Sequence, residues 1–166
     1  MDLTSGSSRG YFYEDFELGL VMHSGARTIT EHDIISFAGM TGDFSPIHMD
    51  AEFSKASPFG ERIAHGLLGL VIAQGLVALT GHIWDSGVAS LSWRNWEFKA
   101  PIRIGDTLRV RWTVTEKRKS RSQPGLGLIT EFIELVNQNG AIVQQGEHVT
   151  LLKRRQLPTE HTTTDG

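Results

Sequence analysis

An acid and an imidazole lie close together in the first third of the chain. Asp43 and His48 are five residues apart in the segment T-G-D-F-S-P-I-H-M-D. A carboxylate can take a proton from water and an imidazole can deliver one to carbon, so this pair is typical of general acid–base catalysis. Five residues on an ideal helix would point the side chains apart, and Pro46 disfavours a helical Ser45. We therefore expect an irregular turn that brings Asp43 and His48 together.

A long apolar segment follows this pair and must help to position it. His65 precedes the run G-L-L-G-L-V-I-A-Q-G-L-V-A-L, which occupies residues 66–79. A helix that is apolar on all faces is buried, and one of this length is too short to span a bilayer. We expect residues 66–79 to form a buried central helix, and the region 43–64 before it to be mostly loop.

Two short helices are expected before the central one. Thr30 opens a Thr-x-x-Asp capping box, which predicts a helix that ends at Gly39 and Gly42. Asp50 is expected to cap a second helical turn over residues 51–56. Both helices flank the Asp43 segment, so they would hold its two ends.

The rest of the chain carries strand signals. Alternation is clearest where Leu108, Val110, Trp112 and Val114 share one face of a predicted strand, and Asn139-Gly140 predicts a hairpin. In another strand the apolar phase slips between two tryptophans, which indicates a bulge near Asn95. The expected strands are residues 22–29, 89–100, 107–117, 126–137 and 141–154.

These elements predict an α+β fold in which an antiparallel sheet wraps around a long central helix. One helix cannot cover both sides of such a sheet, so we expect a homodimer or a higher homo-oligomer. The five remaining histidines are predicted to be solvated or locally bonded: His23, His32, His82, His148 and His161. The four tryptophans lie on or beside predicted core elements, so we expect them to pack in the core.

Composition restricts the kind of partner. The chain has 166 residues, a net charge of −3 and no cysteine. This length fits one domain, which we place at residues 11–157 between flexible segments 1–10 and 158–166. The charge gives no general attraction to nucleic acid or to an anionic membrane, so a small-molecule ligand is favoured. The absence of cysteine excludes a thiolate metal site and a cysteine nucleophile, and it fits a cytoplasmic location.

Three segments resemble a known family. D-F-S-P-I-H-M-D, F-G-E-R-I-A-H-G-L-L and W-E-F-K-A-P-I-R-I-G-D-T-L are similar to the MaoC-like, R-specific enoyl-CoA hydratases, over roughly residues 11–153. The resemblance implies a single hotdog fold. It also implies syn addition of water to a trans-2-enoyl-CoA, or the reverse reaction from an R-3-hydroxyacyl-CoA, with coenzyme A as part of the substrate and no other cofactor or metal.

The resemblance also implies roles for individual residues. Asp43 would be the general base that orders and deprotonates water, and His48 would share that water and protonate the alpha carbon. The backbone N–H of Gly66 would stabilise the developing oxyanion, which fits the free N–H groups at a helix start. The substrate site would also include Ser45, Pro46, Ile47, His65 and Val71. The chain departs from the family at two of these positions, since Ser45 stands where Asn is frequent and Val71 where some hydratases have serine.

Other functions stay open at the level of sequence. A hotdog thioesterase generally has an acid within the central helix, and residues 66–79 contain none. A non-catalytic acyl-binding or structural subunit is disfavoured by Asp43 and His48 but not excluded. A metal site is conceivable at Asp43, His48, Asp50 and His65, although no His pair has helical ligand spacing. Candidate contacts for coenzyme A phosphates are Lys55, Arg62, Lys99, Arg103 and the run 117–121.

Overall fold

The computed structural model describes residues 10–155, so the predicted flexible segments lie outside the described residues apart from Gly10. Five strands form one antiparallel sheet in the order β1-β3-β4-β5-β2. The strands are β1 (Val21–Thr28), β2 (Gly87–Phe98), β3 (Thr107–Lys119), β4 (Leu126–Val136) and β5 (Ile142–Lys153). Each lies within a few residues of its predicted range.

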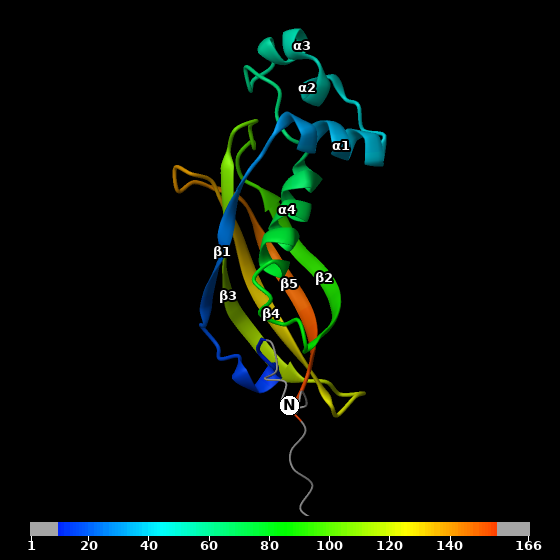
Figure 1. Cartoon of the computed structure of the whole chain (residues 1–166), viewed down its shortest axis with the longest axis vertical. Helices are drawn as coiled ribbons and strands as arrows, with labels where there is room; N and C mark the ends of the chain where they lie inside the picture. The colour runs from blue at the N-terminus through cyan, green and yellow to red at the C-terminus, as the bar shows by residue number, and fades with distance from the viewer. Residues whose placement is uncertain (1–9, 156–166) are drawn as a thin grey trace, which may run out of the picture.

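The long helix α4 (Gly66–Ala78) lies along one face of this curved sheet, and the shorter helices gather beyond its N-terminus (Figure 1). These helices are α1 (Glu31–Thr41), α2 (Pro46–Met49) and α3 (Ala51–Lys55), whereas the short 3-10 helix η1 (Tyr13–Asp15) lies at the opposite end of the molecule. The predicted α+β arrangement of an antiparallel sheet around a central helix is confirmed, and it is the single hotdog arrangement that the family resemblance implies. Within residues 10–155, no helix has the length and hydropathy needed to cross a membrane.

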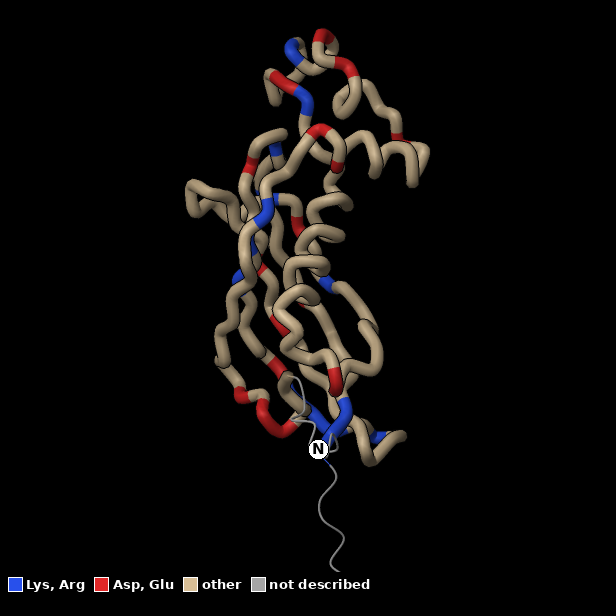
Figure 2. The backbone as a smooth tube through the Cα atoms, in the orientation of Figure 1, with Lys and Arg blue, Asp and Glu red and all other residues tan. Residues whose placement is uncertain are grey.

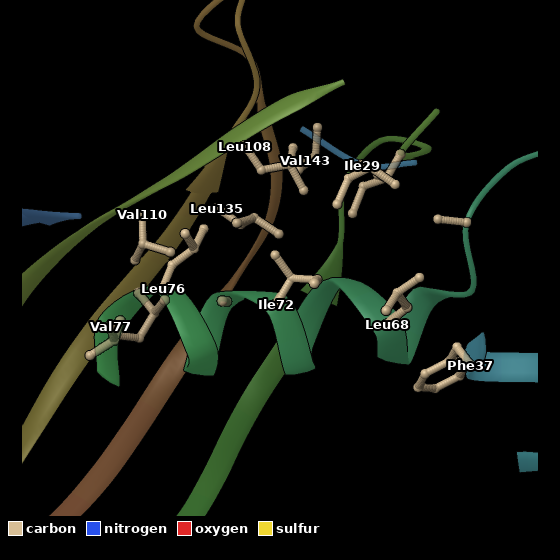
Figure 3. Packing of buried hydrophobic residues seen from close by; sticks show 14 of the residues in the cluster. Ile29, Phe37, Leu68, Ile72, Leu76, Val77, Leu108, Val110, Leu135 and Val143 are labelled. Carbon is tan, nitrogen blue, oxygen red and sulfur yellow. The ribbon is translucent and has the colours of Figure 1, made fainter. Parts of the chain in front are cut away.

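The main core lies between α4 and the sheet (Figure 3). Leu68, Ile72 and Leu76 of α4 are at most 5% exposed. They pack in one cluster with side chains of three strands, among them Leu108, Val110, Leu135 and Val143. The alternating face predicted for β3 is confirmed, because its four apolar residues are all buried. This packing fixes α4 relative to the sheet.

The opposite face of α4 is open, which corrects the prediction of a fully buried helix. Leu67 and Val71 of α4 are 58% and 51% exposed, and Leu79, directly after the helix, is 77% exposed. The sheet covers only one side of α4, so an apolar strip of these three residues stays uncovered in the single chain. Trp84 is another correction, since it is 62% exposed although Trp112 is fully buried as predicted.

The predicted start of α1 is confirmed, but its end differs in part from the prediction. The Thr30 capping box is present, but α1 continues through Gly39 and ends at Gly42, whose φ of +79° is easy only for glycine. Asp50 caps α3 as predicted, because its side chain accepts a hydrogen bond from the backbone N–H of Phe53 at 3.0 Å.

The region predicted to be mostly loop contains an additional helical turn. Pro46 is the first residue of α2, where its missing N–H leaves no helical hydrogen bond unmade and its fixed φ suits a helix start. Pro46 thus keeps Ser45 out of the helical conformation and still begins the helix itself. His48 lies in this turn, whereas Asp43 lies before it in the irregular segment that follows α1.

The predicted bulge in β2 is confirmed. Asn95 has φ +50°, and the pairing with β5 shifts register between Arg94 and Glu97. The shift lets Trp93 and Trp96 pack against the same core, with their ring centroids 5.1 Å apart. Trp93 and Trp96 are three residues apart, so in a regular strand their side chains would point to opposite faces of the sheet. The extra residue of the bulge is needed for this contact.

Candidate active site

A tight turn after α1 presents the carboxylate of Asp43. Its Oδ1 accepts hydrogen bonds from the hydroxyl of Ser45 at 2.5 Å and from the backbone N–H of Ser45 at 3.2 Å. Asp43 is exposed, and these two donors from Ser45 hold its pKa below the usual value. Asp43 is therefore ionised at neutral pH and able to accept a proton. Serine replaces the family's frequent asparagine without loss of this hydrogen bond.

The imidazole of His48 is fixed by a backbone carbonyl. Its Nδ1 lies 2.8 Å from the carbonyl oxygen of Ile63, and an oxygen of this kind only accepts. Nδ1 must therefore carry the hydrogen, which leaves Nε2 free to exchange a proton. His48 is half-buried, so one side of the ring is enclosed by protein and the other can meet a ligand.

His65 connects the Asp43 turn to the start of α4. It is only 2% exposed, and its Nε2 donates to the backbone carbonyl of Asp43 at 2.9 Å. Its ring stacks on that of His48, with centroids 3.9 Å apart and an interplanar angle of 29°. These contacts hold the turn, α2 and α4 together, so the geometry supports a structural role for His65.

The three side chains are close enough to be considered as a metal site. Each of Asp43, His48 and His65 offers one ligand atom, and these atoms lie within 4.8 Å of one another. The lone pair of an imidazole lies in its ring plane, however, and stacked rings do not direct two such lone pairs to one point. One nitrogen of each ring is also bonded to a carbonyl. The arrangement suits proton transfer better than metal binding.

A mostly apolar cavity of about 260 Å³ begins at His48. Gly66 stands at the same end, where the first N–H groups of α4 have no partner within the helix. A Cβ on Gly66 would lie 2.9 Å from Cε1 of Phe98, so glycine is required for this close packing. The cavity is lined by His48, Phe59, Ile63, Ala64, Gly66, Phe98, Lys99, Ala100, Pro101, Ile102 and Gln144.

The structure gathers most of the residues singled out from the sequence. Asp43, Ser45, His48, His65 and Gly66 lie around the mouth of the cavity or contact one another. Two others shape α2 and the turn beneath it: Pro46 starts the helix, and the carbonyl of Ile47 accepts a hydrogen bond from the hydroxyl of Ser54 at 3.1 Å.

Val71 is placed elsewhere, on the exposed strip of α4, and it does not line this cavity. Conversely, sequence reasoning did not identify Phe98 and Gln144, which close the cavity from β2 and β5. The polar Gln144 at an inward position of a strand was the one available signal, but nothing local to β5 indicates what it contacts.

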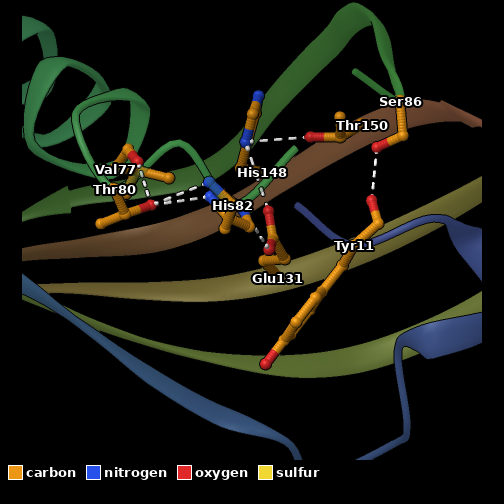
Figure 4. Close-up of polar contacts among 8 residues, drawn as sticks. All are labelled: Tyr11, Val77, Thr80, His82, Ser86, Glu131, His148 and Thr150. Carbon is orange, nitrogen blue, oxygen red and sulfur yellow. Dashed lines mark hydrogen bonds and ion pairs between the residues drawn. The ribbon is translucent and has the colours of Figure 1, made fainter. Parts of the chain in front are cut away.

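A second histidine–carboxylate cluster lies at the other end of α4 (Figure 4). Glu131 of β4 is 1% exposed, and its two oxygens lie 3.7 Å from Nε2 of His82 and 3.7 Å from Nδ1 of His148. Of the two alternatives predicted for these histidines, solvation is excluded because they are 6% and 4% exposed, and local bonding is confirmed by their contacts with Thr80 and Thr150. Burial alone would raise the pKa of Glu131, but the two imidazoles outweigh it and lower that pKa.

Hydroxyl groups complete this buried cluster. Thr80 donates to the carbonyl of Val77 at 2.7 Å and lies 2.9 Å from Nδ1 of His82. Ser90 and Thr150 lie 2.7 Å and 3.2 Å from the two ring nitrogens of His148. The cluster therefore joins the end of α4 to the sheet.

Comparisons with known proteins agree with this architecture. Residues 19–137 match the family model described as MaoC like domain. The chain is 39% identical over 110 residues to a protein of Methylorubrum extorquens named 3-hydroxybutyryl-CoA dehydratase, covering 65% of this chain and 66% of that protein. It is 32% identical over 150 residues to a protein of Rhodospirillum rubrum named (R)-specific enoyl-CoA hydratase, covering 87% and 94%.

A solved structure gives the same result. The crystal structure of a MaoC-like dehydratase from Rhodospirillum rubrum superimposes with a TM-score of 0.81 at 30% identity, covering 89% of this chain and 100% of that one. The chain thus spans slightly less than two thirds of the Methylorubrum protein and nearly all of the Rhodospirillum hydratase.

Proposed function

The chain belongs to the MaoC-like domain family, and from this premise we propose that it is a hydro-lyase acting on acyl-CoA thioesters. It adds water to a trans-2-enoyl-CoA to give an R-3-hydroxyacyl-CoA, or catalyses the reverse reaction. The relatives named hydratase and dehydratase support this class of reaction. The observation that carries the proposal is the ionised Asp43 beside His48 at the mouth of an apolar cavity that also exposes the first residue of α4.

The proposed reaction uses each of these groups once. Asp43 takes a proton from water, and the resulting hydroxyl bonds to C3 of the enoyl chain. The electrons of the C2–C3 double bond move toward the thioester oxygen, where the N–H of Gly66 stabilises the negative charge. Asp43 then passes this proton to the free Nε2 of His48, which delivers it to C2 on the same face. Both side chains thereby return to their starting protonation states.

The cavity supports an acyl group of moderate size and coenzyme A as the carrier. Its wall is mostly apolar, which suits an alkyl chain, and Lys99 is the one cation among its lining residues. The ammonium of Lys99 lies 3.3 Å from the carboxylate of Glu97, and both side chains are about half exposed. A phosphate could therefore replace Glu97 as the partner of Lys99. The other candidate cations Lys55, Arg62 and Arg103 are paired with Glu52, Glu31 and Glu61. We propose no cofactor beyond coenzyme A and no metal.

A homodimer would cover the apolar strip of α4, and we propose this state. β2 is at one edge of the sheet, so within the described residues its outer side has no strand partner and is open to a second copy. Val71→Asp should shift the protein to monomer in sedimentation velocity.

Acidic and basic residues are interspersed along the chain (Figure 2), which supports neither nucleic acid nor a membrane surface as a partner. The cysteine-free composition supports a cytoplasmic location.

The test is to follow enoyl-thioester absorbance with trans-2-enoyl-CoAs that are short, long, branched or carboxylated, while free thiol is measured in parallel. Loss of conjugation without thiol release is expected, and Asp43→Asn should abolish it. Glu52→Gln is the matched control, because it makes the same acid-to-amide change on nearby α3. Release of thiol would instead identify a thioesterase, and no reaction with any substrate would favour an acyl-binding subunit.

A further inference from the structure

Gln144 is a buried amide in the wall of the cavity, and both ends of the amide are hydrogen bonded. The side chain is 2% exposed. Its Nε2 donates to the backbone carbonyl of Gly66 at 2.9 Å, and its Oε1 accepts from the indole N–H of Trp96 at 3.0 Å. The indole nitrogen can only donate, so it must face the amide oxygen. The NH₂ group therefore faces Gly66, and the orientation of the amide is fixed.

The surrounding residues leave space for this contact. A Cβ on Gly69, one turn further along α4, would overlap the amide of Gln144. A Cβ on Gly146 would lie 2.6 Å from Cε3 of Trp96. The bulge at Asn95 gives Trp96 its inward position. Three separate backbone features thus accommodate the pair of Trp96 and Gln144, although an apolar side chain would fill the same volume without needing a partner.

The contact acts on the residue with the greatest conformational freedom in the site. Glycine samples more backbone conformations than any other residue, so a glycine that must aim its N–H needs external support. The peptide before Gly66 follows His65, which is anchored to the carbonyl of Asp43. The peptide after Gly66 carries the carbonyl that Gln144 holds. Gly66 is therefore restrained from both sides.

We propose that Gln144 is a positioning residue for the reaction: by holding the carbonyl of Gly66, it keeps the N–H of Gly66 aimed at the thioester oxygen. This inference rests on the hydro-lyase function proposed above. Charge accumulates on the thioester oxygen in the transition state, so Gln144 should stabilise the transition state and contribute little to binding of the substrate in the ground state. Misalignment of an oxyanion donor lowers kcat more than it raises KM.

The first test compares Gln144→Met with Gln145→Met. Gln145 is the next residue of β5 and is only half-buried. Its side chain does not line the cavity, and its Nε2 donates a hydrogen bond of 2.9 Å to Glu97. Gln144→Met should lower kcat by about 10- to 100-fold with KM changed by less than about 3-fold, because complete loss of such a donor costs about 10²- to 10³-fold. Gln145→Met should match wild type.

Two further variants keep the test valid if Gln144→Met does not fold. Gln144→Leu removes both hydrogen bonds with a side chain of similar size, so kcat should fall as far as in Gln144→Met. Trp96→Phe removes only the partner of the amide oxygen, so the loss of kcat should be smaller. Equal kcat values in wild type, Gln144→Leu and Trp96→Phe would overturn the proposal.

The second test measures the hydrogen bond itself. In an Asp43→Asn background, whose turnover should be slowed by about 10²- to 10⁴-fold, a trans-2-enoyl-CoA bound before it reacts should show a thioester carbonyl stretch shifted from its value in solution. Adding Gln144→Met should return the frequency toward the solution value, whereas adding Gln145→Met should not. An unchanged shift with Gln144→Met would refute the positioning role. A wild-type protein that hydrates no enoyl-CoA would instead refute the proposed function.

Discussion

The two ends of α4 each lie near one carboxylate and two imidazoles, but the clusters differ in what surrounds them. At the N-terminal end, Asp43 is exposed and His48 lines a cavity. At the C-terminal end, Glu131 is enclosed between His82 and His148. The same residue types can therefore serve proton transfer where an atom is left free toward a ligand, and hold elements together where every atom faces protein.

The backbone explains this difference. Asp43 lies in a turn, where its own neighbour Ser45 supplies hydrogen bonds and the carboxylate stays in contact with solvent. Glu131 lies in a central strand of the sheet, and Trp93 stacks on His148 with centroids 4.3 Å apart. A charge so enclosed depends on its partners, because water cannot replace them.

The largest expected effect is on catalysis at the open end. Asp43→Asn should lower kcat by about 10²- to 10⁴-fold, the range typical for a general base, because the amide cannot accept the proton from water. The melting temperature should stay at the wild-type value, since the side chain is exposed and packs against little. Steady-state kinetics and thermal unfolding check both points. Wild-type turnover in this variant would remove Asp43 from the mechanism.

The same acid-to-amide change at the closed end should have the opposite outcome. Glu131→Gln should reduce the free energy of unfolding by about 3 kcal/mol, because it replaces the buried carboxylate that faces both imidazoles with a neutral amide. The folded protein should keep the wild-type kcat. Glu52→Gln is the control, since both side chains of its ion pair with Lys55 are mostly exposed and the pair should contribute little to stability. Urea unfolding of both variants gives the comparison, and equal losses would contradict it.

The pH dependence of stability should separate the clusters further. The pKa of Glu131 is lowered in the folded state from its usual value of 4.5, so its contribution to stability is present above pH 4.5. That contribution is lost as the pH falls through the folded-state pKa. The free energy of unfolding of wild type should therefore fall more steeply below pH 4.5 than that of Glu131→Gln. Parallel curves in acid urea titrations would show that Glu131 is not the group responsible.

The smallest expected effect lies between the clusters, at the β2 bulge. Asn95 has a positive φ, which asparagine tolerates better than alanine. Asn95→Ala should destabilise the protein by about 1 kcal/mol, whereas Asn95→Gly should be nearly neutral. Chemical denaturation of the two variants measures the difference. Equal stabilities would mean that the backbone at this position is not strained in either variant.

Features that depend on neighbouring residues were predictable from the sequence. The Thr30 capping box, the Asn139-Gly140 turn and the alternation in β3 each involve a few adjacent positions, and all three are present. The proximity of Asp43 and His48 belongs to the same class, because one short turn determines it.

Features made by distant residues were not predictable. Gln144 meets Gly66 across 78 residues, and neither segment carries a sign of the other. His82 and His148 read as scattered polar residues because their burial depends on Glu131, which comes from a third segment. The exposed strip of α4 was not predictable for the same reason, because it depends on contacts with distant strands. Hydropathy gives the total apolar surface of a helix but does not indicate which face the sheet covers.

The strand order also sets the sequence of events during synthesis. In the described sheet β2 pairs only with β5, which follows two intervening strands in the chain. At roughly 5–20 residues per second, a ribosome needs a few seconds to produce the segment between them. During that delay Asp43, His48 and α4 already exist, but the amide that holds Gly66 does not. The cavity is therefore completed by the last strand, and a nascent chain stopped before β5 would possess the reactive side chains without the wall that aligns them.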